Sequence, residues 1–189
     1  MATAFAWRFC LGPLREVRGE GEMGDLQHLH SAWDVDRHIV LEGDRLVLVR
    51  FSHYEAPPPA AAAAADGEGP GGGGLTPHFI ATRQMDEVLA ALAPKVRKYC
   101  VIYAVSTTEV PEFNTMYELG HDREPFALMF FFRNTHIRVD VGTGNNNKIN
   151  FFIEAEDLLP IIDAAYRAGK SGKAATSSEK KFTTAAVRR

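Results

Sequence analysis

The sequence predicts an α/β fold with a central mixed sheet flanked by helices, and three observations lead to that prediction. Two apolar runs, LVLVRF at 46–51 and CVIYAV at 100–105, have the composition of fully buried strands. A segment with apolar residues at helical spacing, about 84–98, lies between them. The stretch LMFFFRNTHIRVDV at 128–141 combines a continuous apolar run, a polar turn and an alternating run, which indicates an antiparallel hairpin.

The remaining elements complete the order βαβαβαββα. A short strand at 28–30 and a helix at about 34–42 precede the first buried strand. Pro94 is expected to kink or shorten the next helix, and a short helix is expected from Val110. The last helix is expected to begin near Asp157 as its N-cap. Two right-handed parallel crossovers, an antiparallel hairpin and a closing helix form the thioredoxin topology, so we predict a thioredoxin-like fold.

We expect residues 23–168 to form this one domain, with three segments that add nothing to its core. Residues 1–22 are expected to be a disordered extension, or to result from a start assigned upstream of Met23. Residues 55–77 contain a proline triplet, an alanine run and consecutive glycines, a composition that predicts a disordered insertion. Residues 169–189 are rich in serine and lysine and are expected to form a flexible basic tail.

The composition is that of a globular protein whose bulk charge does not favour nucleic acid. Hydrophobic residues make up 46% of the chain, the net charge is -3 and the pI is about 6.2. No apolar run approaches the roughly 18 residues of a membrane span. Cys10 and Cys100 make neither a disulfide framework nor a metal site, and they favour a reducing compartment. The histidines form no ligand pattern, so we expect no metal and no cofactor.

A thioredoxin fold raises the question of disulfide chemistry. That chemistry needs Cys-x-x-Cys at the start of the helix after the 46–51 strand, where the helix N-terminus lowers the thiol pKa. The sequence continues there with Ser52, His53 and Tyr54, and Cys100 is expected to be a small buried hydrophobe. We therefore expect no catalytic residues and no enzymatic activity. The alternative, a divergent thioredoxin-type disulfide oxidoreductase, rests on the fold alone.

The hairpin is followed by Gly142-Thr143-Gly144 and three asparagines, which raises the question of phosphate binding. A phosphate loop would continue to Gly-Lys-Ser/Thr, and a dinucleotide fingerprint would continue to a third glycine; neither is present. The preceding strand is also predicted to be antiparallel, which is the wrong context. A turn in which glycine and asparagine tolerate positive φ is the simpler interpretation. The three asparagines and Lys148 are also suited to a polar recognition surface.

At the hairpin the sequence resembles the spliceosomal thioredoxin-like proteins of the DIM family, through the motif MFFFRN followed by GTGNNNKIN. The matching runs are HLHSAWDVDRHI (28–39), VRFSH (49–53), MDEVL (85–89), TEVPEFNTMYEL (108–119), MFFFRNTHIRVDVGTGNNNKIN (129–150), and Ile161-Ile162 through Tyr166-Arg167. The chain departs from the family in the Pro/Ala/Gly insertion. It also departs at Phe126 and Ala127, which stand where small polar residues and a cysteine are common.

The resemblance implies a nuclear, non-catalytic subunit of the U-five snRNP and tri-snRNP that is required for pre-mRNA splicing. It implies contacts with the large core scaffold protein of that particle and with a helical-repeat bridging protein, and only indirect contact with small nuclear RNA. It implies no membrane partner, and we expect the free protein to be monomeric.

We therefore predict a protein-contact surface built from polar residues of the hairpin turn and of the asparagine loop, because these residues exceed what turn geometry alone requires. They are Arg133, Asn134, Asn145, Asn146, Asn147 and Lys148. The sequence leaves open whether the Glu124–Pro125 peptide bond is cis.

Overall fold

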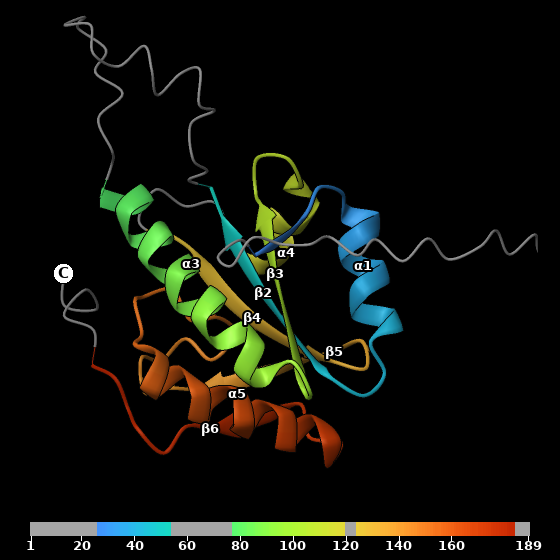
Figure 1. The fold of residues 1–189 in the computed structure, drawn as a ribbon, viewed down its shortest axis with the longest axis vertical. Coiled ribbons are helices and arrows are strands. Elements are labelled where there is room, and N and C mark those ends of the chain that lie inside the picture. Colours follow the sequence, from blue (N-terminus) through green and yellow to red (C-terminus); the bar gives the residue numbers. More distant parts are fainter. Residues whose placement is uncertain (1–25, 54–76, 120–123, 184–189) are drawn as a thin grey trace, which may run out of the picture.

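Six strands form one sheet in the order β1-β3-β2-β4-β5-β6 in the computed structural model, which describes residues 26–53, 77–119 and 124–183 (Figure 1). The strands are β1 (Gln27–Leu29), β2 (Leu46–Ser52), β3 (Cys100–Ser106), β4 (Ala127–Phe132), β5 (Thr135–Asp140) and β6 (Ala175–Ser177). β1 and β2 run parallel to β3, whereas β4 runs antiparallel to β2 and to β5. The first five strands have the order and directions of the thioredoxin fold, so the predicted fold class is confirmed.

Helices cover both faces of this sheet (Figure 1). The helices are α1 (Ala32–Leu41), α3 (Pro77–Val96), η1 (Pro111–Phe113), α4 (Asn114–Tyr117) and α5 (Ala155–Lys170). α3 and α5 pack on one face, whereas α1 packs on the other together with the short η1 and α4. The first face therefore has two long helices over it, and the second has one helix of ten residues and two short turns.

β4 is the central strand of the two-sided core. Its side chains alternate between the layers: Leu128, Phe130 and Phe132 join the α3–α5 core, whereas Ala127, Met129 and Phe131 join the α1–α4 core. Every residue of β4 is buried, as the continuous apolar run predicted. Full burial of each large apolar side chain contributes about 1.5–3 kcal/mol.

Two helices begin earlier than the sequence pattern indicated. α3 starts at Pro77 rather than near Gln84, and proline is favoured at a first helical position because its missing N–H has no partner there. The prediction of disorder as far as residue 77 is therefore wrong at its end; residues 54–76, like residues 1–25, lie outside the described part of the chain. α5 begins at Ala155 rather than at Asp157.

Residues 169–183 belong to the folded domain, so the prediction of a flexible tail is wrong for them. β6 pairs in parallel with β5, and the backbone N–H of Phe182 donates to the carbonyl of Val141 at 2.7 Å. The ring of Phe182 lies 5.4 Å from that of Phe151. The sequence does not indicate this strand, because it consists of only three small residues. It forms by pairing with the edge of β5. Residues 184–189 of the predicted tail lie outside the described residues.

Gly169 shows how closely α5 approaches the sheet. A Cβ atom at this position would lie 2.6 Å from Cγ of Phe132, inside the contact distance of a buried aromatic ring. Gly→Ala inside a helix normally stabilises by roughly 0.5–1 kcal/mol. We predict the opposite sign for Gly169→Ala, a loss of about 1–3 kcal/mol in the free energy of unfolding measured with urea, because overpacking outweighs helix propensity.

Gly43→Ala is the matched control, since its Cβ would meet no atom within 4 Å. The control should unfold within about 0.5 kcal/mol of the parent. Equal urea midpoints of unfolding for Gly169→Ala and Gly43→Ala would contradict the close contact between Gly169 and Phe132.

The side chain of Lys181 connects the segment after β6 to the end of β5. Its Nζ donates to Oδ2 of Asp140 at 2.6 Å, and this hydrogen bond is the main reason that the pKa of Asp140 lies below its usual value. A carboxyl group with a lowered pKa in the folded state stabilises the fold above its unfolded-state pKa, and this contribution is lost as the pH falls through the folded-state pKa. We predict that Lys181→Met raises the pKa of Asp140 toward its usual value, as measured by NMR titration of the carboxyl carbon.

Lys180→Met removes the same charge from the neighbouring position, where the partner is Asp157. This variant should leave the pKa of Asp140 unchanged. A similar rise in both variants would mean that overall charge, rather than the Lys181 contact, sets the pKa of Asp140.

Candidate interaction site

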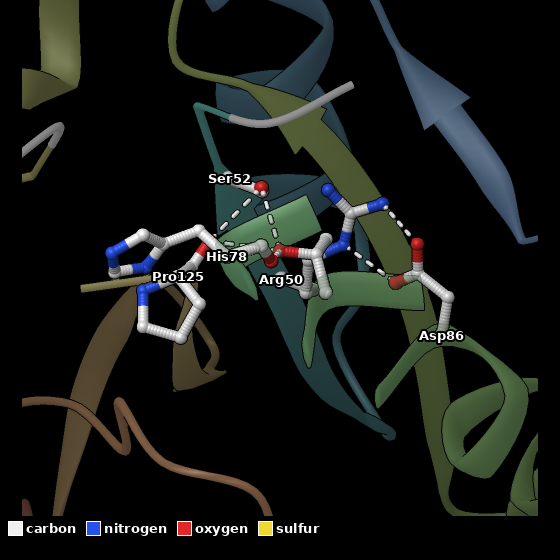
Figure 2. Close-up of polar contacts among 6 residues, drawn as sticks. Arg50, Ser52, His78, Asp86 and Pro125 are labelled. Carbon is white, nitrogen blue, oxygen red and sulfur yellow. Dashed lines mark hydrogen bonds and ion pairs between the residues drawn. The ribbon is translucent and has the colours of Figure 1, made fainter. Parts of the chain in front are cut away.

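The end of β2 and the start of α3 form the region where a thioredoxin fold carries its redox thiols. Ser52, the last residue of β2, is buried, and its hydroxyl donates to the carbonyl of Pro125 at 3.2 Å. The hydroxyl of Thr82 on α3 lies 2.9 Å from the same carbonyl and 3.3 Å from the Ser52 oxygen. Figure 2 shows Ser52 beside Pro125, and the hydroxyl and carbonyl groups together join the three segments. No described peptide bond is cis, so the Glu124–Pro125 bond is trans.

The nearby histidine is not placed as a general base for Ser52. The imidazole of His78 points away from Ser52 (Figure 2), whereas its backbone carbonyl lies 2.9 Å from the Thr82 hydroxyl. A serine nucleophile requires the imidazole within hydrogen-bond reach of its oxygen. The cluster of hydroxyl groups therefore serves to hold β2, α3 and the segment before β4 together.

Two residues earlier on the same strand, Arg50 of β2 is buried between the sheet and α3. Its side chain is 1% exposed, and Nε and Nη2 donate to the two carboxylate oxygens of Asp86 at 2.8 and 2.9 Å. Figure 2 shows this two-point contact beside the Ser52 cluster. The geometry is the bidentate one in which guanidinium–carboxylate pairs are strongest. The pair fixes α3 against β2 in a defined orientation.

We predict that Asp86→Asn lowers the free energy of unfolding by about 3 kcal/mol, toward the lower end of the range for broken buried pairs because the Asp86 side chain is 22% exposed. The loss arises because a buried guanidinium is left facing a neutral group. Urea unfolding at pH 7 measures it. Glu87→Gln, the same chemical change on the exposed neighbouring residue, is the control and should be nearly neutral.

The double variant Arg50→Met with Asp86→Leu should recover most of the stability, because apolar residues of similar size replace a buried pair at little cost. If Asp86→Asn and Glu87→Gln unfold at the same urea concentration, the Arg50–Asp86 ion pair does not contribute the predicted free energy of unfolding.

Cys100 is unsuited to thiol chemistry in the folded protein. It lies in β3 and is 1% exposed. Burial raises the pKa of its thiol to about 12, so the group is protonated at neutral pH. The thiolate is the nucleophilic form of cysteine, and Cys100 is therefore a packing residue of the α3–α5 core.

The turn of the hairpin is formed by Arg133 and Asn134, two of the predicted contact residues. Their φ angles are +48° and +60°, as in the two-residue type I′ turn that matches the twist of a hairpin. Both residues are exposed. Arg133 is anchored, because its Nε donates to the carbonyl of Gly43 at 2.8 Å and its guanidinium lies 5.3 Å from the ring of Phe132.

The asparagine loop is held against β5 by its backbone. The carbonyl of Asn146 accepts from the N–H of Val139, and the carbonyl of Asn147 accepts from Nε2 of His136, both at 2.9 Å. The side chain of Asn145 caps the loop by accepting from the N–H of Asn147 at 3.1 Å. Asn146 and Asn147 are exposed, so their amide side chains face solvent. The hydrogen bonds of the backbone hold the loop itself in place.

His136 connects the loop to the hairpin as a neutral ring. A carbonyl oxygen only accepts hydrogen bonds, so Nε2 carries the proton in the contact with Asn147. Burial lowers the pKa of His136 below its usual value, and this effect outweighs the opposing effect of the hydrogen bond. The imidazole is therefore uncharged at pH 7.

The structure corrects the prediction for Lys148, which is buried rather than placed at a contact surface. Its side chain is 5% exposed, and Nζ lies 2.7 Å from the carboxylate of Glu124 and donates to the carbonyl of Glu118 at 2.7 Å. Asn150 donates to the other carboxylate oxygen of Glu124 at 2.8 Å. Lys148 thus ties the end of the α4 turn to the segment that leads into β4. Buried charges of this kind are normally paired and hydrogen-bonded, as this one is.

The Gly142–Gly144 loop is a turn, as the simpler interpretation predicted. Gly142 and Gly144 have φ angles of +89° and +84°, which glycine adopts without strain. The N–H of Gly142 donates to the carboxylate of Asp140, so an acid lies where a phosphate cradle would need positive charge. β5 is antiparallel to β4, as expected.

Two further classes of site are not found in the described residues. No group of three or more histidine, cysteine, aspartate or glutamate side chains is placed to hold a metal ion in residues 26–53, 77–119 and 124–183. Within these same ranges no helix combines the length and the apolarity that a membrane span requires.

A small pocket that the sequence did not predict lies beside the hairpin. Asn134 and His136 line it together with Asp36 from α1 and Tyr117 from α4. These residues are far apart in the chain, and in sequence Tyr117 and Asp36 look like ordinary helix residues. Only the packing of α1 and α4 beside the hairpin brings them together. Of the predicted contact residues, Asn134 lines this pocket, and Asn147 is linked to it through the hydrogen bond of its carbonyl with His136.

These features define a class of protein: a thioredoxin-like fold in which hydroxyl and carbonyl groups occupy the redox position, next to a rigid polar hairpin and loop. Comparison with known proteins identifies the family. The family model described as "Mitosis protein DIM1" matches residues 80–182. The chain belongs to this DIM1 family.

Curated relatives match over most of their lengths. "Mitosis protein dim1" of Schizosaccharomyces pombe is 39% identical over 160 residues, which cover 84% of this chain and 94% of the relative. "Spliceosomal protein DIB1" of Eremothecium gossypii is 38% identical over 78% of this chain and 86% of its own. "Thioredoxin-like protein 4A homolog" of Dictyostelium discoideum is 36% identical over 78% of this chain and 76% of its own.

Among solved structures, a thioredoxin of Fasciola hepatica is similar over 73% of this chain and 97% of that chain, with 14% identity and a TM-score of 0.44. A TM-score of this size is too low to support a fold assignment. The fold assignment therefore rests on the order and directions of the strands.

Proposed function

We propose that this chain is a spliceosomal protein that acts in the nucleus as a non-catalytic subunit of the U-five snRNP and tri-snRNP. The observation that carries the proposal is its membership of the DIM1 family, since it covers 86% of a relative named as a spliceosomal protein and 94% of another named mitosis protein dim1. Its role is to hold partner proteins, among them a large scaffold protein and a helical-repeat bridging protein. RNA is engaged through those proteins.

Two features of the fold support a binding role over a chemical one. The region that carries thiols in a redox thioredoxin holds the Ser52 and Thr82 hydroxyls, and the thiol of Cys100 is buried with a raised pKa. The hairpin turn and the asparagine loop, in contrast, present exposed amide and guanidinium groups on a backbone fixed by hydrogen bonds. A backbone that is already fixed loses little conformational entropy on binding, which favours a contact surface.

The tagged full-length protein is expected to co-purify with the spliceosomal small nuclear RNAs, with the U-five RNA most enriched, as measured by sequencing the RNA bound to it. Asn146→Ala with Asn147→Ala should reduce this enrichment several-fold while leaving the fold intact, because these two residues hold the loop through backbone groups, which alanine keeps. Circular dichroism and thermal unfolding check the fold.

Gln84→Ala is the matched control, since it removes an exposed amide from α3, on the opposite layer of the molecule. It should co-purify like the parent. Absence of spliceosomal RNA from the parent preparation would refute the proposed function. Parental enrichment with the double variant would refute the assignment of the asparagine loop as a contact surface.

A further inference from the structure

The face of the sheet that carries α1 and α4 is not completely closed. A pocket of about 140 Å³ opens between α1, α4 and the hairpin. Five rings contribute to its wall: Phe51, Phe113, Tyr117, Phe131 and His136.

Tyr117 is the centre of the aromatic wall. Its ring lies 5.8 Å from the ring of His136, 6.1 Å from Phe131 and 6.3 Å from Phe113. Rings at these separations pack edge to face or stacked, so each is held in orientation by the others. The wall is therefore rigid, and it brings several aromatic rings together at the pocket.

The charge at the pocket is negative. Asp36 of α1 is the one lining residue that carries a formal charge, since His136 is neutral at pH 7 and the other lining side chains are aliphatic, aromatic or amide groups. The charge of Asp36 also contributes to the raised pKa of Tyr117, after the larger effect of burial, which shows that the carboxylate acts on the ring at the centre of the wall. Aromatic faces beside a carboxylate attract a cation, and a planar guanidinium satisfies both at once by stacking on a ring and pairing with the acid.

A larger hollow among the described residues, between α5 and β6, shows no comparable preference. The groove between α5 and β6 has a volume of about 530 Å³ and is lined by both acids and bases, among them Asp163, Arg167 and Lys173. It is too wide for one side chain, and its mixed charges select neither sign. The aromatic pocket differs because its size and its charge both suit a single cationic side chain.

We propose that this aromatic pocket, walled by Tyr117 and bounded by Asp36, receives one arginine side chain of a partner protein. The guanidinium pairs with the Asp36 carboxylate while its plane lies against the aromatic wall, and Asn134 at the hairpin turn lies at the rim to accept from a remaining N–H. The inference deepens the proposed function, because it names the chemistry by which the partner is held.

The test uses Nα-acetyl-arginine amide as the probe and the isotope-labelled full chain, with binding followed by amide chemical shifts. The probe should bind with a dissociation constant on the order of 1 mM, as expected for a single side chain, and shift the amides around Asp36, Tyr117 and His136. The citrulline analogue, which has the same shape without the charge, and the lysine analogue should each bind at least about threefold more weakly.

Asp36→Asn should weaken the arginine probe about three- to tenfold, whereas Glu112→Gln, which removes the same charge from an exposed residue of η1 outside the pocket, should not. Both positions are exposed, so the variants are expected to fold, and their spectra verify this. Absence of shifts at the pocket, equal binding of citrulline or lysine, or an equal effect of the two variants would each overturn the inference.

This experiment is independent of the particle. Probe binding without co-purification of spliceosomal RNA would contradict the proposed function and leave the pocket assignment in place. Co-purification without probe binding would support the proposed function and contradict the pocket assignment.

Discussion

The structure depends on one constraint, the burial of β4 on both faces. A strand whose side chains are all apolar cannot present either side to water, so helices must cover both sides of the sheet at its centre. α3 and α5 cover one side with two long helices, and Gly169 allows α5 to approach Phe132 closely. The other side is closed by α1 and the short α4, and the aromatic pocket lies where this thinner cover ends.

The region that could hold redox thiols is used for structural contacts in this chain. The Arg50–Asp86 pair and the hydroxyls of Ser52 and Thr82 connect β2, α3 and the segment before β4. Buried polar groups are normally hydrogen-bonded, and these contacts give partners to the Arg50 guanidinium and to the two hydroxyls while they fix the helix in place. The exposed groups suited to recognition lie elsewhere, on the hairpin turn and the asparagine loop.

His136 links the two parts of the candidate site. One nitrogen of its ring holds the asparagine loop through the carbonyl of Asn147, and the ring itself stands in the wall of the aromatic pocket against Tyr117. The loop and the pocket therefore share one rigid support.

The sequence by itself determined the fold class, the buried strands and the hairpin, because continuous and alternating apolar runs directly record which faces of a strand meet the core. It also determined the absence of a redox motif and the turn character of the Gly142–Gly144 loop. Only the tertiary structure decided that Lys148 is buried, that residues 169–183 complete the sheet and that Asp36 and Tyr117 share a pocket. The physical reason is that charge, small strands and isolated helix residues carry no periodic signal. Their place depends on partners such as Glu124 and the edge of β5, which lie far away in the chain.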